Sequence, residues 1–250
     1  MYGAIIGDIA GSKYEFLGYK KVPQTILDKD CFFTDDTVMT VAVADALINK
    51  KDMGATLREY GRKYPAKGYG LSFDAWLKSD DPLAYFSYGN GAAMRVSAAA
   101  WIGKTWGEVM DLATKATIVT HNHPEGLRGA QAVATAIYMA RKGFCKTEIM
   151  DYIENEFKYD VTFTLDEIRP VYMFDESCQE TVPAALVAFY ESTSFDTAIK
   201  LAISLGGDAD TLAAIVGSIA EAYYGVPDKF IRKARKFIPK EFRKVVDKIY

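Results

Sequence analysis

Residues 206–224 begin with Gly206-Gly207-Asp208-Ala209-Asp210-Thr211 and continue as a largely apolar run to Tyr224, which Gly225 follows. The two glycines permit backbone conformations closed to other residues, and two carboxylates and a threonine hydroxyl come directly after them. The apolar residues have helical spacing, and glycine is common just beyond a helix C-terminus. The stretch therefore predicts a long apolar helix that carries an acidic cluster at its start.

A second acidic cluster, Thr34-Asp35-Asp36-Thr37, opens another apolar stretch that extends to Ile48. The simplest interpretation of either cluster is an ordinary helix N-cap, worth about 1 kcal/mol. One cap explains one Asp or Thr, but it does not explain four such residues in a row or a second cluster after a Gly-Gly pair. The two clusters together favour a functional interpretation.

Carboxylates crowded in this way raise one another's pKa values unless a cation compensates their charge. Hard oxygen ligands of this kind suit Mg²⁺, Mn²⁺ or Ca²⁺ better than zinc. If folding brings the two acidic clusters together, they form a dinuclear metal site. Metal-assisted hydrolysis is then favoured over covalent acyl-enzyme chemistry, because the chain has no GxSxG signature.

Helical periodicity dominates the rest of the chain. The expected helices are 37–48, 53–64, 92–102, 105–120, 124–142, 147–157, 182–191, 194–205 and 208–224. Two short segments, 160–165 and 170–174, have the composition of extended pieces. No internal repeat or low-complexity linker divides the chain. We therefore expect an all-α fold in which residues 1–250 form a single domain.

The chain has 250 residues, half of them hydrophobic, and a formal net charge of −3, which argues against binding to nucleic acid through global electrostatics. Its three cysteines, Cys31, Cys145 and Cys178, lie far apart and indicate core residues in a reducing compartment. No signal peptide is evident, because Asp8 interrupts the first apolar stretch. No run reaches the roughly 18 apolar residues of a membrane span. We expect a soluble cytoplasmic protein.

Residues 229–250 form a basic C-terminal segment with nine basic and two acidic residues. Apolar residues recur along the segment as a stripe. This pattern predicts an amphipathic pair of surface helices whose charges are solvated. A contact with nucleic acid or a membrane is the alternative interpretation.

Three further features are candidates for ligand contacts. The polar loop Ser87-Tyr88-Gly89-Asn90-Gly91 leads into a small-residue helix, where exposed N–H groups suit an anion, although Asn-Gly is also common in plain turns. The loop lacks the spacing of a P-loop or a dinucleotide-binding motif. His121 and His123 have no third nitrogen or sulfur ligand nearby in sequence, which favours hydrogen bonding over zinc binding. Glu15 is a candidate further oxygen ligand or gate.

Together these motifs resemble the ADP-ribosylglycohydrolase family, which includes the dinitrogenase-reductase-activating and ADP-ribosyl-acceptor hydrolases. The resemblance extends from residue 3 to about residue 227. Its motifs, in order, are Gly7-Asp8 with Gly11-Ser12, Thr34–Thr37, Gly89–Arg95, Thr120-His121 and Gly206–Thr211. The Thr34–Thr37 cluster and the final motif together are highly specific for this family.

The resemblance implies a compact orthogonal helical bundle in which two Mg²⁺ or Mn²⁺ ions lie at the base of a cleft for ADP-ribose. The implied metal-binding residues are Thr34, Asp35, Asp36, Asp208, Asp210 and Thr211. The implied substrate-binding residues are Ser87, Tyr88, Gly89, Asn90 and Gly91, which hold the diphosphate and distal ribose, and His121. Some family members carry a mobile metal-binding glutamate where this chain has Glu15.

The activity implied is hydrolysis at the anomeric carbon of the distal ribose in an ADP-ribosylated protein or small molecule, with release of ADP-ribose. Asp35 or Asp36 is expected to act as general base, and Glu15 is an alternative acid or base. Two other functions are weighed against this one. An ADP-ribose-binding module without turnover would lack a metal ligand, yet all six positions are intact. A metal-dependent phosphohydrolase would attack the diphosphate and release AMP.

Overall fold

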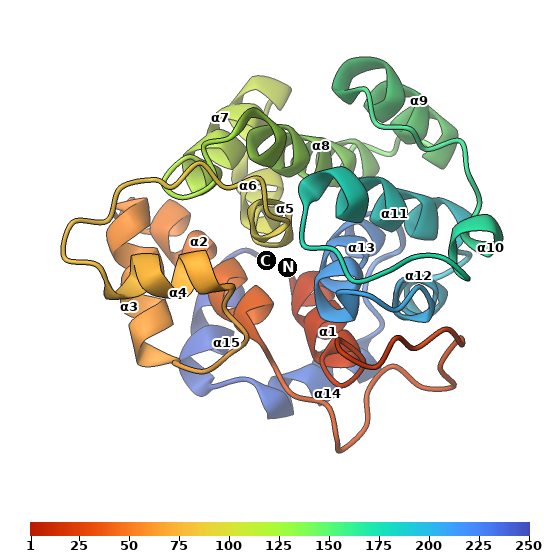
Figure 1. The fold of residues 1–250 in the computed structure, drawn as a ribbon, viewed down its shortest axis with the longest axis horizontal. Helices are drawn as coiled ribbons and strands as arrows, with labels where there is room; N and C mark the ends of the chain where they lie inside the picture. The colour runs from red at the N-terminus through yellow and green to blue at the C-terminus, as the bar shows by residue number, and fades with distance from the viewer.

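The computed structural model describes all of residues 1–250 and contains helices but no β-strand, so the all-α prediction is confirmed (Figure 1). The helices are α1 Tyr2–Gly11, α2 Asp35–Ile48, α3 Met53–Lys63, α4 Leu71–Lys78, α5 Gly91–Met94, α6 Ser97–Ile102, α7 Trp106–Thr117, α8 Pro124–Arg141, α9 Lys146–Phe157, α10 Leu165–Ile168, α11 Cys178–Glu191, α12 Phe195–Ser204, α13 Ala209–Tyr224, α14 Asp228–Phe237 and α15 Lys240–Val246. None of them has the length and hydrophobicity that crossing a bilayer requires.

Helices α1 and α13 lie at the centre of the fold with their backbones in direct contact. A Cβ atom on Gly7 would lie 1.9 Å from the carbonyl oxygen of Ala213, and one on Gly11 would lie 2.4 Å from the Cα atom of Asp210. Glycine is required at both positions, because any side chain would overlap the facing backbone. This close approach sets Asp8 of α1 beside the start of α13, where the acidic cluster of residues 208–211 lies.

Helix α1 is absent from the helices expected from the sequence. All ten of its residues, Tyr2–Gly11, are buried. A helix buried on every side has no polar face, and it therefore shows no amphipathic periodicity by which it could be recognised.

One hydrophobic cluster of 71 buried residues runs from Met1 to Val246. Within it, α13 packs against α1, α8, α11 and α12, while α2 packs against α3, α6 and α15. The two ends of the chain lie side by side in Figure 1, and the amino group of Met1 donates to Tyr250 Oη at 2.6 Å. Helices from both ends of the chain thus share one core, which brings the two acidic clusters within reach of each other.

The helix expected over 92–102 is two short helices, α5 and α6, which meet at Arg95 and Val96. Arg95 is buried, and its guanidinium donates to the carbonyl oxygen of Ala116. The break between the helices follows from this burial, because the turn directs a long charged side chain into the core. Spacing of small apolar residues does not distinguish one helix from two that meet at such a turn.

The extended pieces expected at 160–165 and 170–174 are wrong. Thr164 instead caps α10, accepting a hydrogen bond from the backbone N–H of Glu167, and 170–174 is irregular. A short segment becomes a strand only when a neighbouring strand satisfies its backbone groups. The structure offers no such neighbour, and its one β-bridge joins Gly89 to Ser177.

The basic C-terminal segment forms most of α14 and all of α15 at the surface, along the lower edge of the view in Figure 1. Phe230, Ala234 and Phe242 are buried, while Lys233 and Lys236 are exposed. The segment thus forms two amphipathic surface helices whose lysines face solvent.

Candidate active site and metal centre

A cavity of about 510 Å³ opens between the N-terminal ends of α2, α5 and α13. The segment after α1 and the loops before α4 and α11 complete its wall. Among the residues predicted from the sequence, those that line it are Glu15, Asp35, Asp36, Ser87, Gly89, Asn90, Gly91, His121, Asp208, Asp210 and Thr211. Thr34 and Tyr88 are not part of the lining. The fold therefore brings both acidic clusters and the polar loop to one cavity.

Asp8 organises the acidic cluster of residues 34–37 from behind. Its carboxylate accepts hydrogen bonds from the backbone N–H groups of Thr34 and Thr37, each at 3.0 Å, and from the Thr34 hydroxyl at 2.6 Å. The first N–H groups of a helix have no partner inside the helix, so an external carboxylate stabilises its start. Asp8 thus fixes the beginning of α2 and the direction in which Asp35 and Asp36 leave it.

Asp36 lies where the two clusters meet. The Thr211 hydroxyl donates to Asp36 Oδ2 at 3.1 Å, and carboxylate oxygens of Asp8, Asp36 and Asp210 lie within 4.8 Å of one another. The second oxygen of Asp36, Oδ1, is buried and has no hydrogen-bond partner. An unpaired buried carboxylate oxygen is costly, so this atom calls for a ligand of positive charge.

A second group of carboxylates shares Asp210 with the first. Oxygens of Glu15, Asp208 and Asp210 also lie within 4.8 Å of one another. Asn90 donates through its side-chain amide to Asp208 Oδ2 at 2.7 Å and to the hydroxyl of Thr181 at 3.0 Å. Asn90 therefore ties the polar loop to the acidic cluster, and both of its amide hydrogens are already used.

The charges of these acids are not balanced by the protein. No lysine or arginine forms an ion pair with any of them. Burial raises the pKa of Asp8 to about 6, although hydrogen bonds from Thr34 and Thr37 oppose the rise. Burial, followed by the charge of Asp8, raises the pKa of Asp36 well above its usual range. The cluster is electrostatically incomplete without a cation.

Burial also raises the pKa values of Asp35 and Asp210 well above their usual range. The next largest cause is the charge of Asp8 for Asp35 and the charge of Asp208 for Asp210. All of the donor atoms in the two groups are carboxylate oxygens, with threonine hydroxyls beside them. This donor set fits a hard divalent cation and does not resemble the nitrogen and sulfur ligands of a structural zinc site.

The polar loop lies along one wall of the cavity. The Ser87 hydroxyl accepts a hydrogen bond from the backbone N–H of Gly89 at 3.1 Å, and Ser87 is part of the cavity lining. Tyr88 is 51% exposed, and its ring packs against His123 with centroids 5.3 Å apart. Ser87 and Gly89 are therefore placed to meet a ligand, whereas Tyr88 points away from the cavity.

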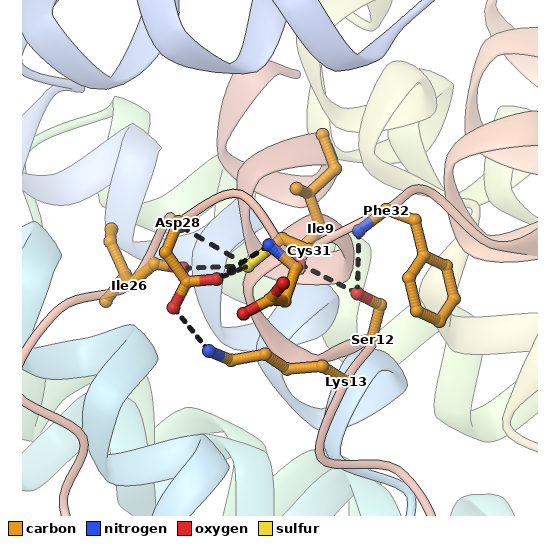
Figure 2. A network of polar contacts seen from close by, with 8 residues as sticks. Ile9, Ser12, Lys13, Ile26, Asp28, Cys31 and Phe32 are labelled. Atoms are coloured by element: carbon orange, nitrogen blue, oxygen red, sulfur yellow. Dashed lines mark hydrogen bonds and ion pairs between the residues drawn. The ribbon is translucent and has the colours of Figure 1, made fainter.

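Glu15 lies on the segment that joins α1 to α2, and polar contacts close the neck of this segment (Figure 2). The Ser12 hydroxyl accepts from the backbone N–H of Phe32 at 3.1 Å, and Lys13 forms an ion pair with Asp28. These contacts join the two ends of the segment, and Glu15 lines the cavity, where burial and the charge of Asp208 raise its pKa to about 7.

Sequence reasoning missed several residues of this site. The sequence motifs include Asp8 but do not predict its role in the site. A carboxylate between glycines on an apolar stretch is the signal that could have indicated it. Tyr69, Phe73 and Tyr85 form an aromatic part of the lining, and they lie in segments without any recognisable motif. Arg95 is the only lysine or arginine in the lining, and the motif that contains it likewise does not predict its role.

A family model described as ADP-ribosylglycohydrolase matches residues 1–250, so the chain belongs to this family. The resemblance seen in the sequence motifs is thereby confirmed. All residues that line the cavity lie within the matched residues.

Similar proteins carry the same theme. The chain is 26% identical to ADP-ribosylhydrolase ARH3 of Mus musculus, over 94% of this chain and 86% of the relative. It is 28% identical to ADP-ribosylarginine hydrolase Tri1 of Pseudomonas putida (strain GB-1), over 93% and 72%. It is 24% identical to ADP-ribosyl-(dinitrogen reductase) glycohydrolase of Rhodospirillum rubrum, over 98% and 92%.

The fold is also similar to a solved structure described as an ADP-ribosylglycohydrolase-related protein complex. The TM-score is 0.77, and the alignment covers 99% of this chain and 94% of that chain. Since the sequences are only 22% identical, this likeness concerns the fold.

Proposed function

We propose that this protein is a metal-dependent hydrolase that cleaves the bond at the anomeric carbon of the distal ribose in an ADP-ribosylated protein or small molecule and releases ADP-ribose. The convergence of two acidic clusters from opposite ends of the chain on one cavity carries this proposal. A volume of about 510 Å³ lies within the range of ligand pockets, roughly 300–1,000 Å³. Membership of the family and the names of the relatives support the same activity.

Two Mg²⁺ or Mn²⁺ ions fit this site best. Asp36, Asp208 and Asp210 would hold them, with further oxygens from Asp35, Thr211 and Glu15. The Thr34 hydroxyl donates to Asp8 instead. When bound, such ions supply positive charge that stabilises charge developing in the transition state. Asp8 has its oxygens occupied by the start of α2, so its role is to position the cluster.

Asp35 is the proposed general base. It lines the cavity, is partly exposed there, and lies outside both tight carboxylate groups. Its carboxylate accepts a proton from the attacking water as the water oxygen bonds to the anomeric carbon and the acceptor leaves. Glu15, with a pKa of about 7, is the alternative acid or base and would give a proton to the leaving acceptor. Ser87, Gly89, Gly91 and His121 would hold the rest of the ligand.

Product analysis by mass spectrometry tests the proposal. The protein is incubated with ADP-ribosyl-arginine, an ADP-ribosyl-serine peptide and O-acetyl-ADP-ribose, each with Mg²⁺, Mn²⁺ or EDTA. Metal-dependent release of intact ADP-ribose from one substrate supports the hydrolase and names its linkage. AMP as the product would instead support a phosphohydrolase, and binding of ADP-ribose without any release would support a binding module.

A further inference from the structure

Arg95 is buried without an acidic partner. It is 1% exposed, lines the cavity and forms no ion pair. Its Nε and Nη2 donate to the carbonyl oxygen of Ala116 at 3.2 and 3.1 Å, and Nη2 also donates to the Thr120 hydroxyl at 2.6 Å. A buried guanidinium is costly unless its hydrogen bonds are made, so the contact with Thr120 is a fixed part of the site.

The Thr120 hydroxyl contacts both Arg95 and His121 and so links the two side chains. Thr120 is fully buried, and the second polar contact of its Oγ1 is His121 Nδ1 at 2.8 Å. A guanidinium only donates, so the hydroxyl accepts from Arg95 and has one hydrogen left to give. If Nδ1 carried the imidazole proton, this hydroxyl hydrogen would be buried without an acceptor, which is unfavourable. Thr120 therefore donates to Nδ1, and the imidazole proton lies on Nε2.

The Nε2 atom faces the polar loop at the cavity wall. A Cβ atom on Gly91 would lie 3.2 Å from Nε2, and one on Gly89 would lie 3.5 Å from it. Because both positions are glycine, the space beside Nε2 is left to a ligand. Nε2 has no hydrogen-bond partner in the protein, so its N–H is free to donate into the cavity.

We infer that Arg95 and Thr120 are positioning residues that hold His121 as a neutral imidazole with its proton on Nε2, where it donates a hydrogen bond to a phosphoryl or ribosyl oxygen of the ligand. The identity of the ligand rests on the proposed function, whereas the tautomer rests on the hydrogen bonds of the protein alone. The guanidinium also places a fixed positive charge in the wall of an otherwise acidic cavity. An anionic oxygen bound there meets a donor that is already oriented.

The charge states fit this arrangement. Burial, and after it the charge of Arg95, holds the pKa of His121 well below its usual range. Burial lowers the pKa of Arg95 to about 10, which leaves the guanidinium charged at neutral pH. His121 is thus a neutral donor and Arg95 a permanent cation under ordinary conditions.

The tautomer is measured directly by long-range ¹H–¹⁵N correlation NMR of the ligand-free protein with ¹⁵N-labelled histidine. The chain contains only His121 and His123, so two imidazole spin systems are expected, and a His123→Gln variant assigns them. The inference predicts a protonated Nε2 and an unprotonated Nδ1 for His121. A His121 signal with the proton on Nδ1, or an even mixture of tautomers, would overturn it whatever substrate the protein cleaves.

Substitutions at Thr120 test the relay, that is, the control of the His121 tautomer by Arg95 through the Thr120 hydroxyl. Thr120→Val removes the hydroxyl, so it should give mixed His121 tautomers and about tenfold weaker binding of ADP-ribose in the presence of Mg²⁺. Thr120→Ser returns the hydroxyl and should restore the Nε2 tautomer and most of the affinity. Thr117→Val is the matched control, because it removes an equally buried hydroxyl that bonds to the carbonyl oxygen of Ala113.

Calorimetry with ADP-ribose and NMR are performed on each variant, with thermal unfolding to show that it is folded. If Thr120→Val does not fold, the comparison of wild type, Thr120→Ser and Thr117→Val still decides the tautomer. A Thr120→Val protein with the wild-type tautomer and affinity contradicts the relay. Failure of the wild type to bind ADP-ribose contradicts the proposed function and leaves the NMR result standing.

Discussion

The acidic wall of the cavity and its Arg95–Thr120–His121 wall differ in whether their buried polar groups have partners within the protein. On the acidic wall, Asp36 Oδ1 is buried without a partner and the pKa values of the carboxylates are raised. On the other wall, Nε and Nη2 of Arg95 and the hydroxyl of Thr120 have hydrogen-bond partners within the protein. The first wall is completed only by a cation, whereas the second is organised before any ligand arrives.

This difference assigns the two walls different tasks. A cluster that repels itself binds a divalent cation strongly, because the cation relieves the repulsion among its carboxylates. A donor whose proton is held in place binds a neutral or anionic oxygen without reorganising. The cavity therefore suits a ligand that has both metal-binding hydroxyls and an anionic group, as ADP-ribose does. Substitutions in the two walls should therefore affect metal binding and ligand binding separately.

The largest expected effect is at Asp210, whose carboxylate belongs to both groups of clustered carboxylates. Asp210→Asn should abolish release of ADP-ribose and weaken metal binding by more than the roughly 10- to 100-fold typical of outer-shell residues. Product analysis and calorimetry with Mn²⁺ measure the two effects. Asp45→Asn is the control, since Asp45 is also buried but bonds to Asn49 and Lys51 away from the cavity. Full activity in Asp210→Asn contradicts the proposed site.

The second prediction concerns stability and pH. Because the pKa of Asp8 is raised from 3.8 to about 6, the metal-free folded state binds more protons than the unfolded state between these values. Asp8 therefore contributes on the order of 3 kcal/mol to the free energy of unfolding of the metal-free protein. This contribution is present below pH 4 and is lost as pH rises through about 6. A saturating divalent cation should offset this loss, by about 2.7 kcal/mol at 100 times its Kd.

Urea unfolding with EDTA or with Mg²⁺, at pH 5 and pH 7.5, measures this difference. The gain in unfolding free energy from the metal should be larger at pH 7.5 than at pH 5. An equal gain at both pH values would show that the carboxylates are already ionised without metal, contrary to the electrostatics of the acidic wall.

The third prediction isolates the Arg95–Thr120–His121 wall. His121→Gln should weaken binding of ADP-ribose by about tenfold, as expected for loss of one hydrogen bond to a charged group, while binding of Mn²⁺ alone stays unchanged. Calorimetry with each ligand separately checks both parts. A parallel loss of metal affinity would mean that the two walls are not independent.

The smallest expected effect comes from the space beside His121. Gly91→Ala places a Cβ atom 3.2 Å from Nε2, so it should reduce ADP-ribose affinity a few-fold and leave the fold intact. Gly107→Ala is the control, because its Cβ atom would meet nothing within 4 Å. Equal affinities in the two variants would place the ligand elsewhere in the cavity.

Much of the fold was accessible to sequence reasoning. Helices such as α3, α8 and α12 have an apolar stripe, a capping residue at the start and a stop signal after the end. Helix α4 (Leu71–Lys78) and helix α10 (Leu165–Ile168) were not expected, because they are too short to establish a period. The missing helix α1 shows the opposite limit, in which burial on all sides removes the period altogether.

The candidate site was accessible to the same degree. Both acidic clusters, the polar loop and His121 stand out because their residue types are unusual at a helix start, and the cavity contains nearly all of them. Tyr88 and Thr34 are the exceptions, since neighbouring positions in a loop point in different directions. Sequence spacing does not decide which of two adjacent side chains faces the cavity.

The sequence by itself determined the all-α class, the family motifs and the chemical nature of the ligands, because these depend on residue type and short-range spacing. Only the tertiary structure decided that Asp8 caps α2, that Asn90 joins Asp208, and that Arg95 acts on His121 through Thr120. Each of these contacts joins different segments of the chain. One hydrophobic core holds these segments together, and glycines let α1 approach α13 closely beside the acidic residues.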